Sequence, residues 1–183
     1  MKYMTYERLV RLQSQDEEVA DAAFAEWEQA CQEYNKHVEA IRPKLPESVQ
    51  GLLDGPCLHD AKLVNMGTDE DSRFFIEVQP DTPGNHGIRL RYELLAEPKA
   101  MKYPDSESRD VGMIWLYDEL DVAEIDVPGI GRVSLFTHSI LFSEGIELVL
   151  HFHKLDVKRY RDALPSILGH RREGAGEREL QPA

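Results

Sequence analysis

Positive charge is scarce in this sequence. The 183 residues include 21 lysines and arginines against 34 aspartates and glutamates, which gives a formal net charge of -13. Such a chain repels the phosphates of DNA and RNA at long range and gains nothing from the release of their counterions. We therefore expect no nucleic acid partner, whereas the charge would favour a basic protein as partner.

Long apolar runs and cysteines are also scarce. No stretch approaches the ~18 uninterrupted apolar residues that a membrane-spanning helix needs, and residues 1–15 lack the apolar segment of a secretion signal. The two cysteines, Cys31 and Cys57, do not have the spacing of a disulfide framework or a zinc site. These absences predict a cytoplasmic protein with reduced thiols and no membrane partner.

The rest of the composition is that of a folded domain. Apolar residues make up 42% of the chain and charged residues 30%, which is far from the composition of disordered chains. The order of the patterns predicts one α+β domain over residues 1–168, with a helical arm at 1–57 and an antiparallel sheet at 58–157. Residues 169–183 contain too few large apolar side chains to offset the entropy of ordering, so we expect a flexible tail there.

Three helices are predicted in the arm. Thr5 is a suitable N-cap for the first, and Ser14 with Glu17 forms an S-x-x-E capping box for the second. A short third helix is expected at residues 46–53. The second helix carries apolar residues at alternating spacings of four and three: Ala20, Phe24, Trp27, Cys31, Tyr34, Val38 and Ile41. We expect this seam to pack on the domain's own sheet, and pairing with another copy is the alternative.

Beyond residue 57 the apolar period changes towards two, which is typical of strands. Six strands are predicted, with short connections and a longer polar loop over residues 96–109. An antiparallel meander is the simplest topology for them. The predicted strands are residues 58–66, 74–79, 87–95, 113–122, 133–142 and 146–155.

The turn between the last two strands decides which side chains are buried. A three-residue loop, 143–145, with Gly145 in the left-handed conformation places Phe136, His138, Ile140 and Phe142 on the core face. A two-residue turn would move them to the opposite face and set His138 against His151. We favour the first register because it buries three large side chains, each worth roughly 2 kcal/mol. His138 is then a buried histidine that needs a hydrogen-bond partner.

One pattern suggests a metal. Gly145, His151 and His153 match the G-x5-H-x-H opening of the cupin metal signature, in which two imidazoles point the same way from one strand. The glutamate and the later histidine of a cupin-like site are missing, so a solvated polar face is the competing interpretation. His151 and His153 are the candidate metal ligands, and no other cofactor is expected.

A cluster of acidic and aromatic residues lies on the fourth predicted strand. Tyr117, Glu119 and Asp121 share one face, whereas Asp118 points to the other. The three could bind a cation or a basic side chain, and a solvated face is the alternative. The catalytic residues, if any, are unknown, because the chain contains no nucleophile elbow and no glycine-rich phosphate loop.

Three segments carry a family resemblance: MKYMT at residues 1–5, LHDA at 58–61 and ILFSEGIEL at 140–148. Together they resemble a family of uncharacterised bacterial domains of unknown function, some of whose relatives are suspected immunity proteins. The resemblance covers much of residues 1–160 and implies no catalytic residues.

The leading hypothesis is a non-enzymatic cytoplasmic protein that binds another protein through an acidic surface. Its sharper form is the neutralisation of a basic toxin. The alternatives are a metal-dependent enzyme using His151 and His153, and a self-associating module built on the 24–41 seam. As oligomeric state we expect a monomer or a weak homodimer.

Overall fold

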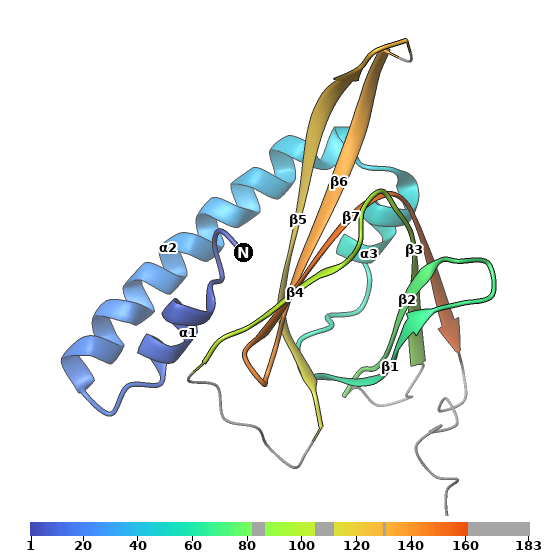
Figure 1. Ribbon diagram of the computed structural model, residues 1–183. Coiled ribbons are helices and arrows are strands. Elements are labelled where there is room, and N and C mark those ends of the chain that lie inside the picture. The colour runs from blue at the N-terminus through green and yellow to red at the C-terminus, as the bar shows by residue number, and fades with distance from the viewer. Residues whose placement is uncertain (82–86, 105–111, 130, 161–183) are drawn as a thin grey trace, which may run out of the picture.

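Two helices pack along each other at the beginning of the chain (Figure 1). The computed structural model describes residues 1–81, 87–104, 112–129 and 131–160, and in it α1 (Tyr6–Leu12) precedes the long α2 (Glu17–Ile41). The Thr5 side chain accepts a hydrogen bond from the backbone of Arg8, so the predicted cap of the first helix is confirmed.

The cap of α2 differs from the predicted capping box. Asp16, not Ser14, is the N-cap, and its carboxylate accepts from the backbone N–H groups of Glu18 and Val19. Ser14 instead accepts from the N–H of Asp16. A carboxylate at the cap also interacts favourably with the positive end of the helix dipole, which a serine cannot do.

The apolar seam of α2 packs on the domain from Trp27 to its C-terminal end. Val38 and Ile41 are buried, and the Tyr34 hydroxyl accepts a hydrogen bond from the backbone of Leu120. Towards its N-terminus α2 runs beyond the sheet, with α1 beside it (Figure 1). There Phe24 is 56% exposed. The expected packing on the domain's own sheet is therefore confirmed from Trp27 onward, where the indole contacts Tyr117 of the sheet, but not for Phe24.

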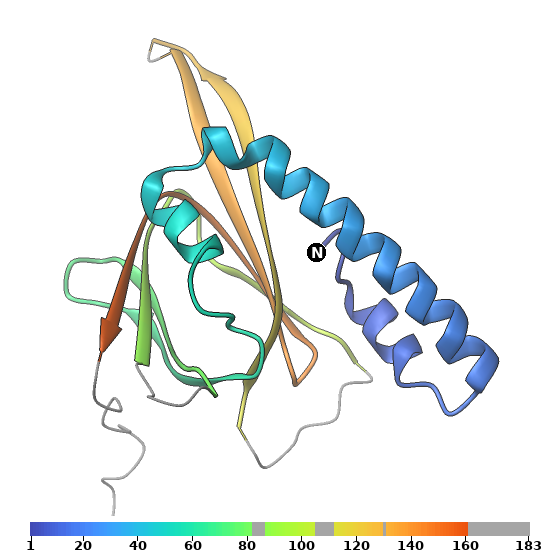
Figure 2. The same cartoon turned by 180° about the vertical axis from the view of Figure 1, so that it is seen from behind.

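After α2 the chain makes a 3-10 turn, η1 (Arg42–Lys44), and then the short helix α3 (Glu47–Leu53). Pro46 is the N-cap of α3, in agreement with the third predicted helix. Val49 and Leu52 are buried in the main core, and Figure 2 shows α3 lying in front of the interior enclosed by the strands. The helix thus contributes its apolar face to the core of the sheet.

The described residues form seven strands, not six. The additional strand, β4, lies within the segment predicted to be a loop. All four of its residues are exposed, so it has no alternation by which to recognise it. The strands are β1 (Ala61–Thr68), β2 (Phe74–Gln79), β3 (Gly87–Leu94), β4 (Lys99–Lys102), β5 (Ile114–Val127), β6 (Gly131–Phe142) and β7 (Ile146–Tyr160).

All strand pairs are antiparallel, and the sheet order is β3-β2-β1-β5-β6-β7-β4 with a further pairing of β3 with β7. This extra pairing closes six of the strands into a ring. The strands β1-β2-β3 form one meander and β5-β6-β7 another. The predicted single meander is wrong where these two halves join, because β5 pairs with β1 and β7 pairs with β3. The β5–β6 hairpin extends beyond the ring (Figure 1).

The last hairpin has the predicted three-residue loop. Phe142 pairs with Ile146, His138 with Leu150, and Gly145 has φ 63°. His138 is fully buried, together with the apolar residues of the same face. Glycine adopts this left-handed conformation without the steric cost of a Cβ, which explains why the turn sets the register. β7 continues to Tyr160, and the predicted tail at 169–183 lies outside the described residues.

Candidate functional site

The strand β5 carries acidic side chains on both of its faces. A bulge between Trp115 and Tyr117 shifts the register, so that Asp118 and Leu120 follow Trp115 on the inner face. Tyr117, Glu119 and Asp121 lie together on the outer face, towards α2 and the first residues of the chain.

Glu119 is buried on the outer face and holds the N-terminal segment. Its carboxylate accepts hydrogen bonds from the backbone N–H groups of Lys2, Tyr3 and Met4 at 2.7, 2.8 and 2.7 Å. Its exposure is 7%. Glu119 therefore does not lie on a solvated face: the N-terminal segment covers it because this carboxylate satisfies donors that no helix or strand uses. Nearby, Glu147 forms an ion pair with the N-terminal amine of Met1.

The other two residues of the predicted interaction surface face α2. The ring of Tyr117 packs edge-on against Trp27, with 4.7 Å between ring centroids. Asp121 remains largely exposed and lies 3.0 Å from Nε2 of His37. The three predicted residues are thus brought together, and contacts within the chain occupy much of them. Binding of a partner by Tyr117 and Asp121 stays a prediction.

On the inner face, Asp118 ends a chain of buried and partly buried hydrogen bonds. Its Oδ1 accepts from Nε1 of Trp115 at 3.0 Å, and its Oδ2 lies 3.1 Å from Nε2 of His138. Nδ1 of the same imidazole lies 2.8 Å from the hydroxyl of Tyr92. Because a carboxylate only accepts, Nε2 carries the hydrogen, and in the neutral imidazole Nδ1 then accepts from the Tyr92 hydroxyl. The buried His138 thus has the partners that the sequence required, and it fixes the orientation of Asp118.

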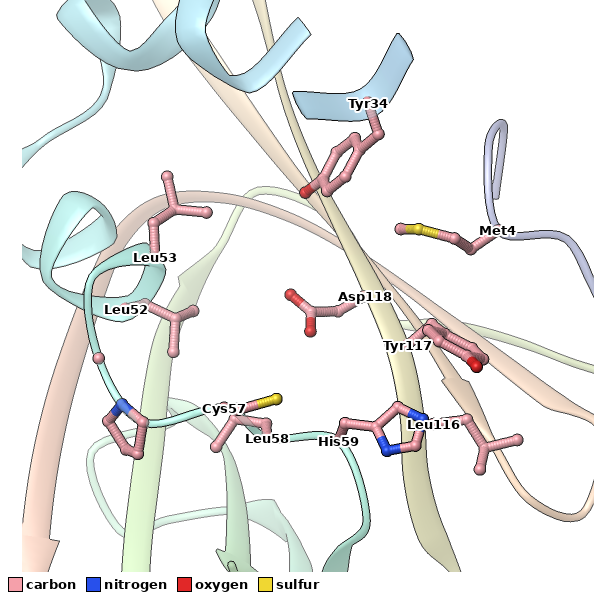
Figure 3. Close-up of a pocket in the computed structure, with 12 residues that line it drawn as sticks. Met4, Tyr34, Leu52, Leu53, Cys57, Leu58, His59, Leu116, Tyr117 and Asp118 are labelled. Atoms are coloured by element: carbon pink, nitrogen blue, oxygen red, sulfur yellow. The ribbon is translucent and has the colours of Figure 1, made fainter. Parts of the chain in front are cut away.

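Asp118 points into a pocket between α2, α3 and β5 (Figure 3). The pocket has a volume of about 460 Å³, within the roughly 300–1,000 Å³ of typical ligand sites. Asp118 is the one carboxylate among the described residues that line it, and these include no lysine or arginine. The guanidinium of Arg159 lies beside Gly55, at one wall. The described lining residues are Met4, Tyr34, Leu52, Leu53, Gly55, Pro56, Cys57, Leu58, His59, Leu116, Tyr117 and Asp118.

The pKa values of two tyrosines of the pocket are raised. Burial, followed by the charge of Asp118, raises the pKa of Tyr34 well above its ordinary value. Burial is also the main cause that raises the pKa of Tyr117. Both hydroxyls are neutral at physiological pH, so the carboxylate supplies the negative charge among the walls of this pocket.

His59 and Asp60, at the start of β1, contact each other. Nδ1 of His59 lies 2.9 Å from Oδ2 of Asp60, because Asp60 adopts a positive φ of 66° and the chain is not extended there. The ring of His59 also packs edge-on against Tyr117, at 5.0 Å between centroids, and so forms part of the pocket wall.

His151 and His153 lie on the outer face of β7 and have separate partners. Nδ1 of His151 lies 3.1 Å from the Thr137 hydroxyl, and Nε2 of His153 lies 3.1 Å from Glu93. A hydrogen bond from Lys154 is the main cause that lowers the pKa of Glu93. Within the described ranges, no group of three or more histidine, cysteine, aspartate or glutamate side chains is arranged to hold a metal ion.

An acidic surface surrounds the exposed Phe24. Glu17, Asp21 and Glu28 lie seven and three residues before it and four after it, so the helix places them on the same side. All three are exposed. We call these four residues, Glu17, Asp21, Phe24 and Glu28, the α2 face. It combines a large apolar side chain with a strongly negative surrounding.

The comparisons with known proteins add no assignment. No family model matches the chain, and no curated protein matches it in sequence. None of the helices in the described part of the chain is long and apolar enough to cross a membrane. The two site features, the Asp118 pocket and the α2 face, are therefore interpreted from their own geometry.

The sequence did not predict the pocket. It placed Asp118 on the opposite face from Tyr117 correctly, but nothing local indicates that Tyr92, some 46 residues before His138, closes the hydrogen-bond chain. That contact depends on the ring of strands. The one local signal was His138, whose burial in the favoured register required polar partners.

Proposed function

We propose that this protein binds a basic protein partner through the α2 face and catalyses no reaction of its own. The observation that carries the proposal is Phe24, a large apolar side chain that is 56% exposed in the middle of an acidic helix surface. Aromatic residues, phenylalanine included, are enriched in the cores of protein interfaces, where a polar rim surrounds them. The surrounding carboxylates would attract a basic surface and orient it during approach.

The proposal includes the cytoplasmic location and the immunity-like role expected from the sequence. Neutralisation of a basic toxin would use the same features, because an acidic protein can cover a cationic active surface.

The geometry favours this function over the two alternatives. A second copy docking face to face on Phe24 would bring together two sets of three carboxylates, and like charges disfavour that contact. A metal-dependent enzyme would need His151 and His153 on one ion, whereas Thr137 and Glu93 engage them separately. Light scattering for the mass and elemental analysis for bound metal test these alternatives directly.

The central experiment is a pull-down of partners from the protein's own cell extract at low and high salt. We expect a protein to be captured at about 0.1 M salt and released at about 1 M, where the Debye length falls from ~10 to ~3 Å. The double variant Asp21→Lys/Glu28→Lys should lose the captured protein. Phe24→Ala should weaken the capture without changing its salt dependence, because the apolar anchor carries no charge.

A matched control separates the α2 face from overall charge. The double variant Glu70→Lys/Glu97→Lys changes the net charge by the same amount at exposed positions outside α2. It should retain the partner almost fully. Equal loss in both double variants would mean that the capture is non-specific, and retention in the Asp21→Lys/Glu28→Lys variant would contradict the proposal.

A further inference from the structure

We infer that the Asp118 pocket receives a lysine side chain of the partner protein. This inference rests on the proposed function, because it names the side chain that a basic partner inserts next to the α2 face. It concerns a different set of residues, so the two can fail separately.

The walls of the pocket suit the stem of a lysine. Leu52, Leu53 and Leu58 supply aliphatic surface, against which a four-carbon chain can pack. The rings of Tyr34 and Tyr117 supply aromatic surface, which attracts an ammonium group through the charge distribution of the ring. Figure 3 shows these side chains around the carboxylate of Asp118.

The carboxylate is oriented in advance. Trp115 donates to Oδ1 and His138 to Oδ2, both from within the protein, and the side chain of Asp118 is still 28% exposed. Each oxygen has a second lone pair, and these are the acceptors available to a ligand in the pocket. A charge-assisted hydrogen bond to a carboxylate held in place requires little further ordering.

The same geometry favours lysine over arginine. A guanidinium binds a carboxylate best as a planar fork that meets both oxygens at once. Here two internal donors, Trp115 and His138, already approach the two oxygens and restrict that arrangement. A compact ammonium with three donors can use a single remaining lone pair.

The pocket continues the α2 face along one side of the helix. Phe24, Trp27, Cys31 and Tyr34 follow one another at spacings of three and four, so they form one stripe. Tyr34 lines the pocket and Trp27 packs on Tyr117, another lining residue. A partner anchored on Phe24 can therefore reach Asp118 along this stripe.

The test uses the full chain and small probes, without the unidentified partner. The chain has two tryptophans, and the indole N–H of Trp115 is bonded to Asp118, so its NMR cross-peak reports on this carboxylate. Nα-acetyl-lysine methylamide should shift the Trp115 cross-peak saturably, with a smaller effect from the arginine analogue. The neutral norleucine analogue, at matched ionic strength, should shift it little.

Two changes to the pocket complete the test. Asp118→Asn should weaken lysine-probe binding about tenfold or more. The amide can still accept from Trp115, and a change of the His138 tautomer can satisfy the other bond.

Alkylation of the exposed Cys57 with N-ethylmaleimide should block the pocket, whereas Cys57→Ser should remain unaffected by the reagent.

The outcomes are distinct. An unshifted Trp115 cross-peak, equal shifts from lysine and norleucine probes, or unchanged affinity in Asp118→Asn would each overturn the inference. Loss of partner capture in Asp21→Lys/Glu28→Lys but not in Asp118→Asn would leave the proposed function standing and remove the pocket from it. If the lysine probe binds but Asp21→Lys/Glu28→Lys still captures the partner, the pocket stands as a lysine site and the α2 face is removed from the proposed function.

Discussion

Asp118 and Glu119 are neighbours on β5, yet the two faces of the strand use their carboxylates differently. Glu119 is covered by the N-terminal segment and accepts three backbone hydrogen bonds. Asp118 accepts from two side chains and keeps part of its surface open to a pocket. A carboxylate whose acceptors are fully used serves the fold, whereas one that is oriented but incompletely used can serve a ligand.

The largest expected effect is on the outer face. Glu119→Ala removes the acceptor of three backbone N–H groups and should lower the free energy of unfolding by about 3 kcal/mol. Glu119→Gln retains one carbonyl oxygen and should cost about half as much. Urea denaturation measures both, and an effect below about 1 kcal/mol for the alanine variant would show that the N-terminal segment is held by other contacts.

The pH dependence of stability compares two tyrosines near Asp118, one on α2 and one in the ring interior. Burial, then the Asp118 charge, raises the pKa of both Tyr34 on α2 and Tyr92 in the ring interior. Unfolding at alkaline pH therefore releases protons, so stability is fully present below pH 10 and falls as the pH rises further. By pH 11, about one unit above the ordinary pKa of tyrosine, each of the two should have lowered the free energy of unfolding by roughly 1 kcal/mol.

Phenylalanine variants identify the two contributions. Tyr34→Phe and Tyr92→Phe should each reduce the loss of stability between pH 9 and 11, as measured by urea denaturation at a series of pH values. An unchanged profile in either variant would mean that its tyrosine ionises as readily in the folded protein as in the unfolded chain.

A smaller effect at neutral pH is expected from Tyr92→Phe. The change leaves Nδ1 of His138 buried without its donor, which should lower the free energy of unfolding by about 1.5 kcal/mol. In a double-mutant cycle with Asp118→Asn we expect a coupling energy above about 0.5 kcal/mol, because both residues bind the same imidazole. Strict additivity would argue against a connected chain of hydrogen bonds.

The smallest effect is expected where α2 runs beyond β5. Phe24→Ala should change stability by no more than about 0.5 kcal/mol, because the side chain is largely exposed and alanine favours helix. Val38→Ala, in the part of α2 that packs on the domain, should cost about 2 kcal/mol. Thermal denaturation of the two variants tests this contrast, and a large loss for Phe24→Ala would place that residue in the core.

The sequence predicted the parts of the fold that depend on local patterns. The 143–145 turn and the alternation of Ile140, Leu148 and Leu150 were sufficient for the register of the last hairpin, since both act within one pair of strands. β4 could not be found because its four residues are all exposed. β4 is a strand because it pairs with a free edge of β7, and this long-range contact has no local signal in the sequence.

The candidate site was less predictable because its parts meet through long-range contacts. Tyr92 reaches His138 only after β3 and β7 have paired, and the cover over Glu119 comes from the N-terminal segment, more than 100 residues away in the sequence. No spacing rule connects such residues. The sequence correctly predicted that the acidic residues of β5 gather on this strand. It did not predict that the N-terminal segment covers Glu119, because that contact depends on a distant part of the chain.

The strand β7 has a consequence for how the protein is made. Along one of its edges it pairs first with β4 and then with β3, while β6 occupies the other. Until β7 has been synthesised, β3 and β6 each expose an unpaired edge that could join a neighbouring chain. Almost all of the described residues must therefore be synthesised before the ring of strands can close. Fragments that end before residue 146 should be insoluble.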